Sequence, residues 1–134
     1  MYNILICDDQ PDIVNALKIY LSMGDYRLFE AYTGRQAVEL VQKEEIHLIL
    51  MDIMMPEMDG LELCSNIKKD IRYSHIPIIL LTAKASEEHQ LEGLETGADD
   101  YITKPFNISQ LEARCRNLLE KRQRMRRKYS RSIA

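Results

Sequence analysis

The sequence predicts an α/β fold, in which a doubly wound five-stranded parallel sheet is covered by five helices. Short apolar runs of strand length alternate along the chain with segments whose apolar residues recur at helical spacing. Three of the runs are apolar at every position, which is typical of strands covered on both faces. Strict alternation of strands and helices favours right-handed crossovers and a parallel sheet. The 134 residues are enough for one domain with a single core.

Five short runs rich in β-forming residues are the predicted strands. The first, third and fourth are apolar on both faces, so we expect them at the centre of the sheet. The five runs are residues 4–7, 26–31, 48–51, 76–81 and 101–102.

Amphipathic segments between these runs predict the helices. Thr33 and Asn107, each followed three residues later by glutamine, have the spacing of a capping box and predict two helix starts. Gly97 is expected to end the fourth helix, because glycine readily adopts the left-handed conformation found there. The apolar positions are Ile13, Val14, Leu17, Tyr20 and Leu21, then Ala37, Val38, Leu40 and Val41, then Leu61, Leu63, Cys64 and Ile67, then Leu91 and Leu94, and finally Leu111, Cys115 and Leu118.

The composition, 46% hydrophobic and 29% charged, is that of a globular protein. No stretch approaches the roughly 20 apolar residues of a membrane span, and no secretory leader is recognisable, so we expect a cytoplasmic protein without a membrane partner. Cys7, Cys64 and Cys115 lie far apart inside apolar runs. They are expected to be buried thiols in a reducing compartment, and not disulfides or zinc ligands.

Charge is divided unevenly along the chain. Residues 121–134 contain seven basic residues and no acid, whereas residues 1–120 contain 11 basic and 21 acidic residues, a net charge of −10. An acidic globule repels a polyanion, so direct nucleic-acid binding by the globule is not expected.

Acidic and polar residues follow the predicted strands. Asp8 and Asp9 follow the first, Asp52 the third, Thr82 the fourth and Lys104 the fifth. In open parallel sheets the functional site lies at the carboxyl ends of the strands, so these residues are expected to converge. Taken singly, each acid is equally well explained as a helix cap or a solvated loop residue. Together, three carboxylates repel one another, and a hard divalent cation such as Mg²⁺ would remove that repulsion.

A site of this composition suits transfer of a phosphoryl group, which depends on positioning and charge neutralisation. Asp52 is the best candidate for the nucleophile, because it follows the central strand between the other two acids and Lys104. The sequence has neither GxxxxGK[ST] nor GxGxxG, so the phosphoryl donor is expected to be another protein or a small phosphate ester.

Five motifs in order and spacing resemble the receiver domain of bacterial response regulators, from about Asn3 to Leu119. The resemblance implies a flavodoxin-like fold with strand order 2-1-3-4-5. It also implies a domain that catalyses only its own phosphorylation and dephosphorylation, with a histidine kinase or phosphotransfer domain as partner. The matching segments are DD at 8–9, MDIMMPEMDG at 51–60, LLTA at 80–83, and GADDYITKPF at 97–106, which includes KPF.

The resemblance also implies roles for the site residues. Asp52 would be the phosphoacceptor, Asp9 and Asp52 would bind Mg²⁺ directly, Asp8 through water, and Met54 through its backbone carbonyl. Lys104 would hold the phosphoryl group.

Three further positions of the resemblance are structural, and two form a switch. Pro56 and Gly60 match the loop after the phosphoacceptor, where glycine would permit the turn. The bond before Pro105 matches a cis peptide. Thr82 and Tyr101 would be the switch pair, although a strand tyrosine is also well explained as a core residue.

The basic segment divides the chain into a receiver domain, residues 1–119, and a helical extension, residues 120–134. Continued three- and four-residue spacing gives Arg122, Met125 and Tyr129, a heptad-like seam with one charged position. The segment fits a solvated linker to an output domain, a helix that pairs with a second copy, or a direct DNA contact. Its sequence also resembles the segment after receivers in hybrid sensors that combine a kinase, a receiver and a helix-turn-helix regulator.

Two functions follow from the resemblance. The leading one is a phosphorylation-activated receiver that switches an attached output, expected to be transcription regulation, with dimerisation on phosphorylation as one possibility. The alternative is a stand-alone phosphotransfer or docking module without DNA-binding output.

Overall fold

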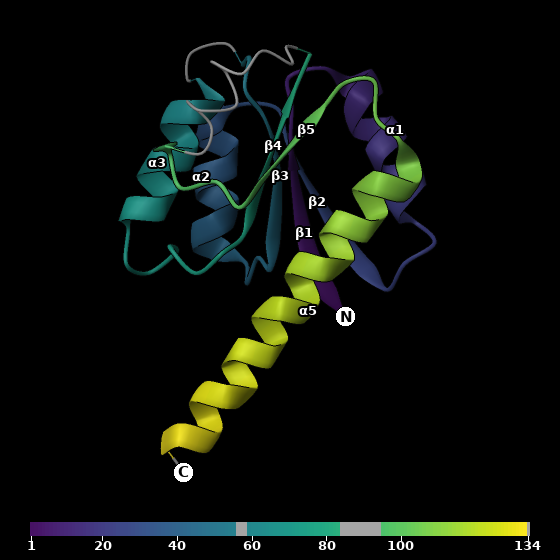
Figure 1. The fold of residues 1–134 in the computed structure, drawn as a ribbon. Helices are drawn as coiled ribbons and strands as arrows, with labels where there is room; N and C mark the ends of the chain where they lie inside the picture. Colours follow the sequence, from purple (N-terminus) through teal and green to yellow (C-terminus); the bar gives the residue numbers. More distant parts are fainter. Residues whose placement is uncertain (56–58, 84–94, 134) are drawn as a thin grey trace.

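The computed structural model describes residues 1–55, 59–83 and 95–133, and side chains as far as residue 127. Five parallel strands form one sheet in the order β2-β1-β3-β4-β5, which confirms the predicted topology (Figure 1). The strands are β1 (Tyr2–Cys7), β2 (Tyr26–Ala31), β3 (Leu48–Asp52), β4 (Ile78–Thr82) and β5 (Asp100–Thr103). The helices of the described residues are α1 (Pro11–Leu21), α2 (Gly34–Lys43), α3 (Gly60–Lys69) and α5 (Ile108–Ile133).

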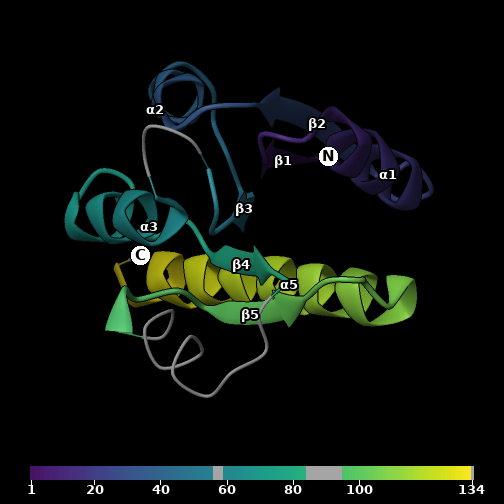
Figure 2. The ribbon, with the colours of Figure 1, turned by 90° about the horizontal axis from the view of Figure 1, so that it is seen from above.

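The described helices cover both faces of the sheet (Figure 2). On one face, α1 and α5 pack against β1, β3 and β4, and on the other face α2 and α3 do so. The strands β3 and β4 are buried along their whole length, as their continuous apolar sequence predicted. The two faces of the sheet are therefore buried in two hydrophobic layers. These layers hold the strands in place, so the strand ends lie at fixed positions along the edge of the sheet.

Helix starts follow the predicted capping residues. The Thr33 hydroxyl accepts a hydrogen bond from the amide of Gln36 at 3.1 Å, and the Gln36 side chain accepts one from the amide of Tyr32 at 2.7 Å. The Asn107 side chain accepts from the amide of Gln110 at 3.0 Å. These contacts satisfy amides that the first turn of a helix leaves free.

The predicted fourth helix and the start of the fourth strand lie in the second half of the chain. The predicted fourth helix, with Leu91 and Leu94, lies outside the described residues, but Gly97 has the expected positive φ of 90°. The fourth strand begins at Ile78 and not at Ile76. Pro77 explains the later start, because proline has no amide hydrogen to donate to a neighbouring strand.

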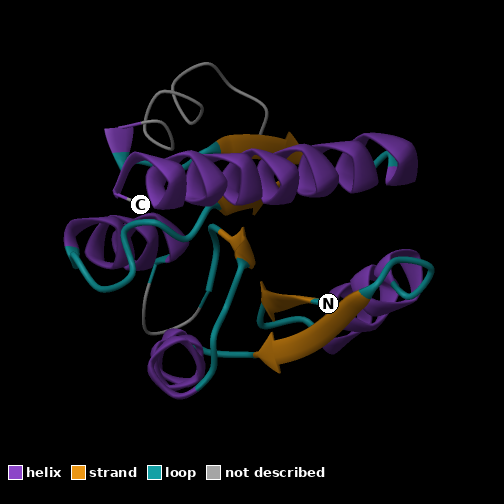
Figure 3. Ribbon diagram, turned by 90° about the horizontal axis from the view of Figure 1, so that it is seen from below, coloured by secondary structure: helices purple, strands orange, loops and turns teal. Residues whose placement is uncertain are grey.

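The last helix, α5, continues without interruption into the basic segment and passes the amino-terminal edge of the sheet (Figures 1 and 3). Leu111, Cys115 and Leu119 are buried against the sheet, whereas Leu118 is only partly buried. Leu118 packs against the edge of this core, as predicted, and Leu119 is the more deeply buried neighbour that the sequence did not identify. No helix within the described ranges is both long and apolar enough to cross a membrane.

Candidate functional site

The carboxyl ends of three adjacent strands bring the predicted site together. Asp8 directly follows β1, and Asp52 and Thr82 are the last residues of β3 and β4. Because these strands are neighbours in the sheet, their ends lie side by side. Lys104 follows β5, and its amide donates a hydrogen bond to the carbonyl of Thr82 at 2.7 Å. This backbone contact fixes the start of the loop that carries the lysine.

Three carboxylates form a compact cluster. One oxygen of each of Asp8, Asp9 and Asp52 lies within 4.8 Å of the others. Asp8 is 0% exposed and Asp52 is 5% exposed, while Asp9 is the most accessible of the three. Oxygen atoms at this separation fit a hard divalent cation such as Mg²⁺, which prefers carboxylate and water ligands. The donor set therefore fits the metal that the sequence predicted.

Lys104 is the base that faces this cluster. Its ammonium group donates to Asp8 Oδ2 at 3.0 Å and to Asp52 Oδ1 at 3.2 Å. From the sequence, Lys104 was expected near Asp52 as the base that holds a phosphoryl group. Its ion pair with Asp8 was not expected. The peptide bond between Lys104 and Pro105 is cis, as the resemblance implied.

Among the described residues, Lys104 alone does not balance the charge of the three acids, and the pKa values reflect this. Burial, and next the charge of Asp8, raise the pKa of Asp52 to about 6, against the opposing effect of Lys104. Burial alone would lower the pKa of Lys104, but its contacts with Asp8 and Asp52 outweigh burial and raise the pKa. The site is therefore a largely buried anionic cluster whose charge Lys104 compensates only in part.

Asp8 is also held by the backbone. Its Oδ1 accepts a hydrogen bond from the amide of Gln10 at 3.0 Å, immediately before α1 begins at Pro11. The Asp8 amide donates to the carbonyl of Ala31 at 3.0 Å, so this residue extends the pairing of β1 with β2. The sequence signal for this turn is an aspartate three residues before a proline. An aspartate side chain readily accepts a hydrogen bond from the amide two residues later, which here is that of Gln10.

Gly60 and Met54 belong to the segment after Asp52, and Pro56 lies outside the described residues. A Cβ atom at Gly60 would lie 2.8 Å from Ile53 Cα and closer still to the backbone oxygen of Asp52. Among the described glycines only Gly97 has a positive φ. Gly60 is therefore needed for close approach to the end of β3, and not for the turn conformation that the sequence analysis assigned to it. The Met54 side chain is 64% exposed, and the role of its backbone carbonyl stays a prediction.

The predicted switch residues occupy different environments. Thr82 is 2% exposed at the end of β4, next to the strand that carries Asp52. Tyr101 is partly buried on β5 and packs against the hydrophobic layer beneath α2 and α3. Their switching role and the specific duties of the other site residues stay predictions.

Cys7 ends β1 beside the acidic cluster, but it is not a second nucleophile. Burial, and then the charges of Asp8 and Asp52, raise the pKa of its thiol to about 12. The thiol donates to Met55 Sδ at 3.4 Å, inside the core. All three cysteines are free and buried, as predicted.

An open five-stranded parallel sheet of order 2-1-3-4-5, with a cluster of three carboxylates at its carboxyl edge, defines a flavodoxin-like α/β domain. The profile of the response regulator receiver domain matches residues 4–116. The chain therefore belongs to the receiver domain family of two-component systems.

Two curated relatives show the contexts in which such a domain is found. "Histidine kinase P4" of Formosa agariphila is 46% identical over 127 residues, which are 95% of this chain and 9% of the kinase. "Transcriptional regulatory protein SrrA" of Staphylococcus aureus is 41% identical over 120 residues, which are 90% of this chain and 48% of the regulator. The chain thus spans less than half the length of either relative.

Solved structures agree with the family assignment. The receiver domain of a signal transduction histidine kinase from Syntrophus aciditrophicus has a TM-score of 0.84 and 36% identity, with 90% of this chain and 92% of that chain covered. The chemotaxis protein CheY4 of Vibrio cholerae has a TM-score of 0.82 and 30% identity, with 88% of this chain and 98% of that chain covered.

Proposed function

We propose that this chain is a phosphorylation-activated receiver in which Asp52 accepts a phosphoryl group from the phosphohistidine of a partner kinase or phosphotransfer domain. The observation that carries the proposal is the position of Asp52, at the end of the central strand β3, with Asp8 and Lys104 in contact around it. Cytoplasmic location follows from that partner and is part of the proposal.

In the proposed transfer, a carboxylate oxygen of Asp52 attacks phosphorus, and the bond from phosphorus to the imidazole nitrogen breaks. The bonding electron pair leaves with the imidazole, which is then neutral or takes a proton from solvent. The raised pKa of Asp52, about 6, still leaves the carboxylate mostly ionised at pH 7 and above, so a nucleophile is present.

The remaining site residues would position and neutralise the transferred group. Lys104 already reaches Asp52 Oδ1 at 3.2 Å, so its ammonium can move to a phosphoryl oxygen on the same carboxylate. Mg²⁺ held by Asp8, Asp9, Asp52 and the Met54 carbonyl would supply the second positive charge that this chemistry needs. Burial of Asp8 and Asp52 limits the access of water to the acyl phosphate.

The output of the proposed receiver lies outside the globule. Inward movement of Thr82 toward the phosphoryl group would change the packing around Tyr101 on β5, which is a local charge change that biases a two-state element. Helix α5 continues without interruption to Ile133. Such a helix supports a rigid connection from the β5 side of the domain to an attached output such as a DNA-binding regulator. Residues 120–134 would then be the linker of a longer protein, and SrrA and the histidine kinase are relatives in which an attached part exists.

One observation favours pairing of two copies as an additional output. Met125 is 61% exposed on the extension, where it offers an apolar side chain to a second α5. The alternative is a phosphotransfer or docking receiver without DNA-binding output, and the chemotaxis protein CheY4 is similar to this chain over 98% of its own solved chain.

Intact-mass analysis tests the central claim. Incubation of residues 1–134 with acetyl phosphate and Mg²⁺ should add about 80 Da, the mass of one phosphoryl group on a carboxylate. Asp52→Asn should abolish the addition. Asp12→Asn is the matched control, because Asp12 is an exposed acid in the first turn of α1 and should leave the addition intact. The same mass gain in Asp52→Asn would refute the assignment.

A further inference from the structure

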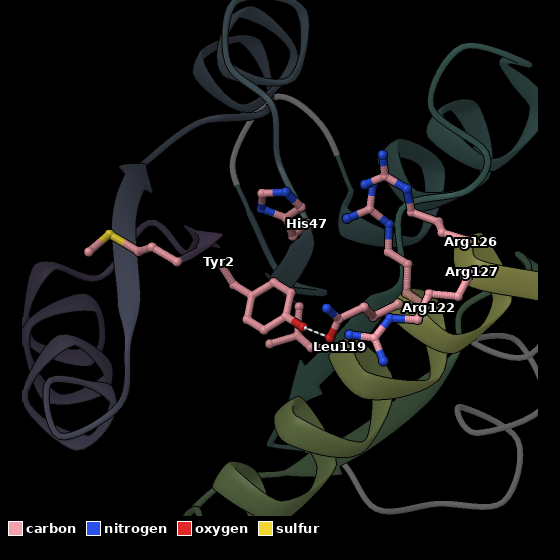
Figure 4. Close-up of a pocket in the computed structure, with 8 residues that line it drawn as sticks. Tyr2, His47, Leu119, Arg122, Arg126 and Arg127 are labelled. Atoms are coloured by element: carbon pink, nitrogen blue, oxygen red, sulfur yellow. Dashed lines mark hydrogen bonds between the residues drawn. The ribbon is translucent and has the colours of Figure 1, made fainter. Parts of the chain in front are cut away.

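A pocket lies at the amino-terminal edge of the sheet, opposite the acidic cluster, where the extension of α5 leaves the globule (Figure 4). It has a volume of about 500 Å³, within the range of sites for small molecules, about 300–1,000 Å³. The start of β1 and the residue before β3 form one wall, and α5 forms the other. The residues that matter here are Tyr2 and His47 on the first wall, and Leu119, Arg122, Arg126 and Arg127 on the second.

Hydrogen bonds hold the two walls in place. The Tyr2 hydroxyl donates to Gln123 Oε1 at 2.6 Å, which ties the globule to the extension. His47 Nδ1 accepts from the amide of Asn3 at 2.8 Å, and the His47 amide donates back to the Asn3 carbonyl at 2.8 Å. The rings of Tyr2 and His47 meet edge to face with centroids 5.7 Å apart. The pocket is therefore preformed in this structure.

The pocket carries positive charge without an acid of its own. No acidic side chain lines it, and Arg122, Arg126 and Arg127 make no ion pair within the described part of the chain. By contrast, Arg114 and Arg116, earlier on the same helix, pair with Asp100 and Glu112 at 2.7 Å and 3.6 Å.

Arg122 carries a buried donor atom in this pocket. Its Nε is buried and has no hydrogen-bond partner among the described residues. Burial, and next the charge of Arg126, lower the pKa of Arg122, and burial followed by Arg122 lowers the pKa of His47. Glu45 lies 3.7 Å from His47 Nε2 and, together with Arg122 and Arg126, lines a neighbouring pocket, but it forms no ion pair with either arginine among the described residues. A buried donor without an acceptor is costly, so an anion in this pocket would relieve the cost.

We infer that this basic pocket binds a phosphate group, as free phosphate or as the phosphate of a nucleotide-sized ester. Planar guanidinium groups match phosphate oxygens in paired hydrogen bonds, and Figure 4 shows Arg122 and Arg126 extending from α5 toward the side of His47. Tyr2 and Leu119 offer an aromatic and an apolar surface to the organic part of an ester. The pocket lies at the amino-terminal edge, away from Asp52, and its assignment does not rest on the proposed phosphoacceptor function.

The matched pair Arg126→Gln and Arg124→Gln tests the inference. Both arginines are exposed on the same helix, and both substitutions remove one charge while keeping helix propensity, but only Arg126 lines the pocket. Titration calorimetry on residues 1–134, without divalent metal and at constant ionic strength, measures binding of AMP, inorganic phosphate and adenosine. We expect AMP to bind with a dissociation constant below about 1 mM.

Arg126→Gln should weaken the binding of AMP about tenfold, which corresponds to about 1.4 kcal/mol. Arg124→Gln should change it less than about twofold, because an exposed charge outside the pocket acts only through screened attraction. Phosphate that binds as tightly as AMP would assign the site to the free ion, and tighter binding of AMP would assign it to an ester. Equal losses in both variants, adenosine binding as tightly as AMP, or no binding of AMP or phosphate would each overturn the inference.

Discussion

The two edges of the sheet concentrate charge of opposite sign. At the carboxyl edge, the described residues form a cluster of three carboxylates, two of which contact the ammonium group of Lys104. At the amino-terminal edge, three arginines and a histidine line a pocket with no acid among its described lining residues. The two edges also differ in burial, because Asp8 and Asp52 are nearly inaccessible whereas Arg126 and Arg127 are exposed. The charge is thus only partly compensated at the acidic edge and lacks an ion pair at the three arginines of the basic edge among the described residues.

Burial decides how much each edge contributes to stability. A charge removed from water interacts strongly with its neighbours and is expensive to leave without a partner. Exposed charges are screened by water and salt, so their pairs contribute little. Substitutions at the acidic edge should therefore change the free energy of unfolding far more than substitutions at the basic edge.

The largest effect is expected for Lys104→Met, which removes the base that contacts Asp8 and Asp52. Without divalent metal at pH 7.5, the free energy of unfolding should fall by about 2–3 kcal/mol, because two buried carboxylates lose their counter-charge. Mg²⁺ should restore part of the loss. Denaturant unfolding, with and without Mg²⁺, measures both changes.

Lys68→Met is the control for that prediction. Lys68 is similarly buried and pairs with Asp99 at 2.8 Å, away from the acidic cluster. The stability that Lys68→Met loses should not be restored by Mg²⁺. Equal rescue of both variants by the metal would show that the effect of Lys104 has nothing to do with the three acids.

Binding of Mg²⁺ itself should stabilise the protein by about 2.7 kcal/mol at a hundredfold excess over the dissociation constant. The reason is that the three carboxylates converge only in the folded chain. Asp9→Asn should lose most of this gain, whereas Asp12→Asn should keep it, because Asp12 lies on α1 outside the cluster. Thermal unfolding against metal concentration is the measurement, and identical curves for Asp9→Asn and the wild type would contradict this placement.

A third prediction uses pH. The pKa of Asp52 is about 6 in the folded protein and 3.8 without the fold, so the folded state binds the proton more tightly. Below about pH 4 the Asp52 side chain is a neutral acid and adds no charge penalty, whereas between about pH 4 and 6 its ionisation increasingly favours the unfolded state. Asp52→Asn lacks this penalty. Without metal, its advantage over the wild type should grow between those pH values to about 1–3 kcal/mol and then stay constant.

Asp70→Asn should behave in the opposite way. Arg72 lowers the pKa of Asp70 through hydrogen bonds, so this carboxylate stabilises the fold above its ordinary pKa and loses that contribution on acidification. The disadvantage of Asp70→Asn should therefore shrink as the pH falls. A parallel pH dependence of the two variants, followed by chemical denaturation, would rule out burial as the cause at Asp52.

The acidic edge could be predicted from the sequence because it depends on topology and on local order. Once five strands alternate with helices, Asp8, Asp52 and Lys104 must meet wherever adjacent strands end. The contact of Lys104 with Asp8 could not be predicted, because it depends on side-chain positions after folding. For the same reason the sequence identified Leu118 on α5 but not Leu119, although both pack against the core and Leu119 is the more deeply buried.

The basic edge was not predicted as a site at all. Its residues come from the first strand, from the segment before the third and from the extension, and no motif connects Tyr2, His47 and Arg122. The seven bases of residues 121–134 suggested a solvated helix, which is how such a run most often behaves. Only the path of α5 past the start of β1 brings them together, and that path depends on the length of the helix.

The smallest effect is expected at the hydrogen bond that joins the globule to the extension. Tyr2→Phe removes the donor to Gln123 and keeps the ring. The bond is exposed, so global stability should fall by only about 0.5 kcal/mol. Amide exchange of residues 120–127 should nevertheless become faster, because this contact holds the extension near β1.

Tyr32→Phe is the control, because it removes a comparable exposed hydrogen bond, to Glu30 at 2.9 Å, that does not touch α5. Hydrogen exchange followed by mass spectrometry should thus separate the two variants, and unchanged exchange in Tyr2→Phe would show that the extension is held by the buried part of α5 alone.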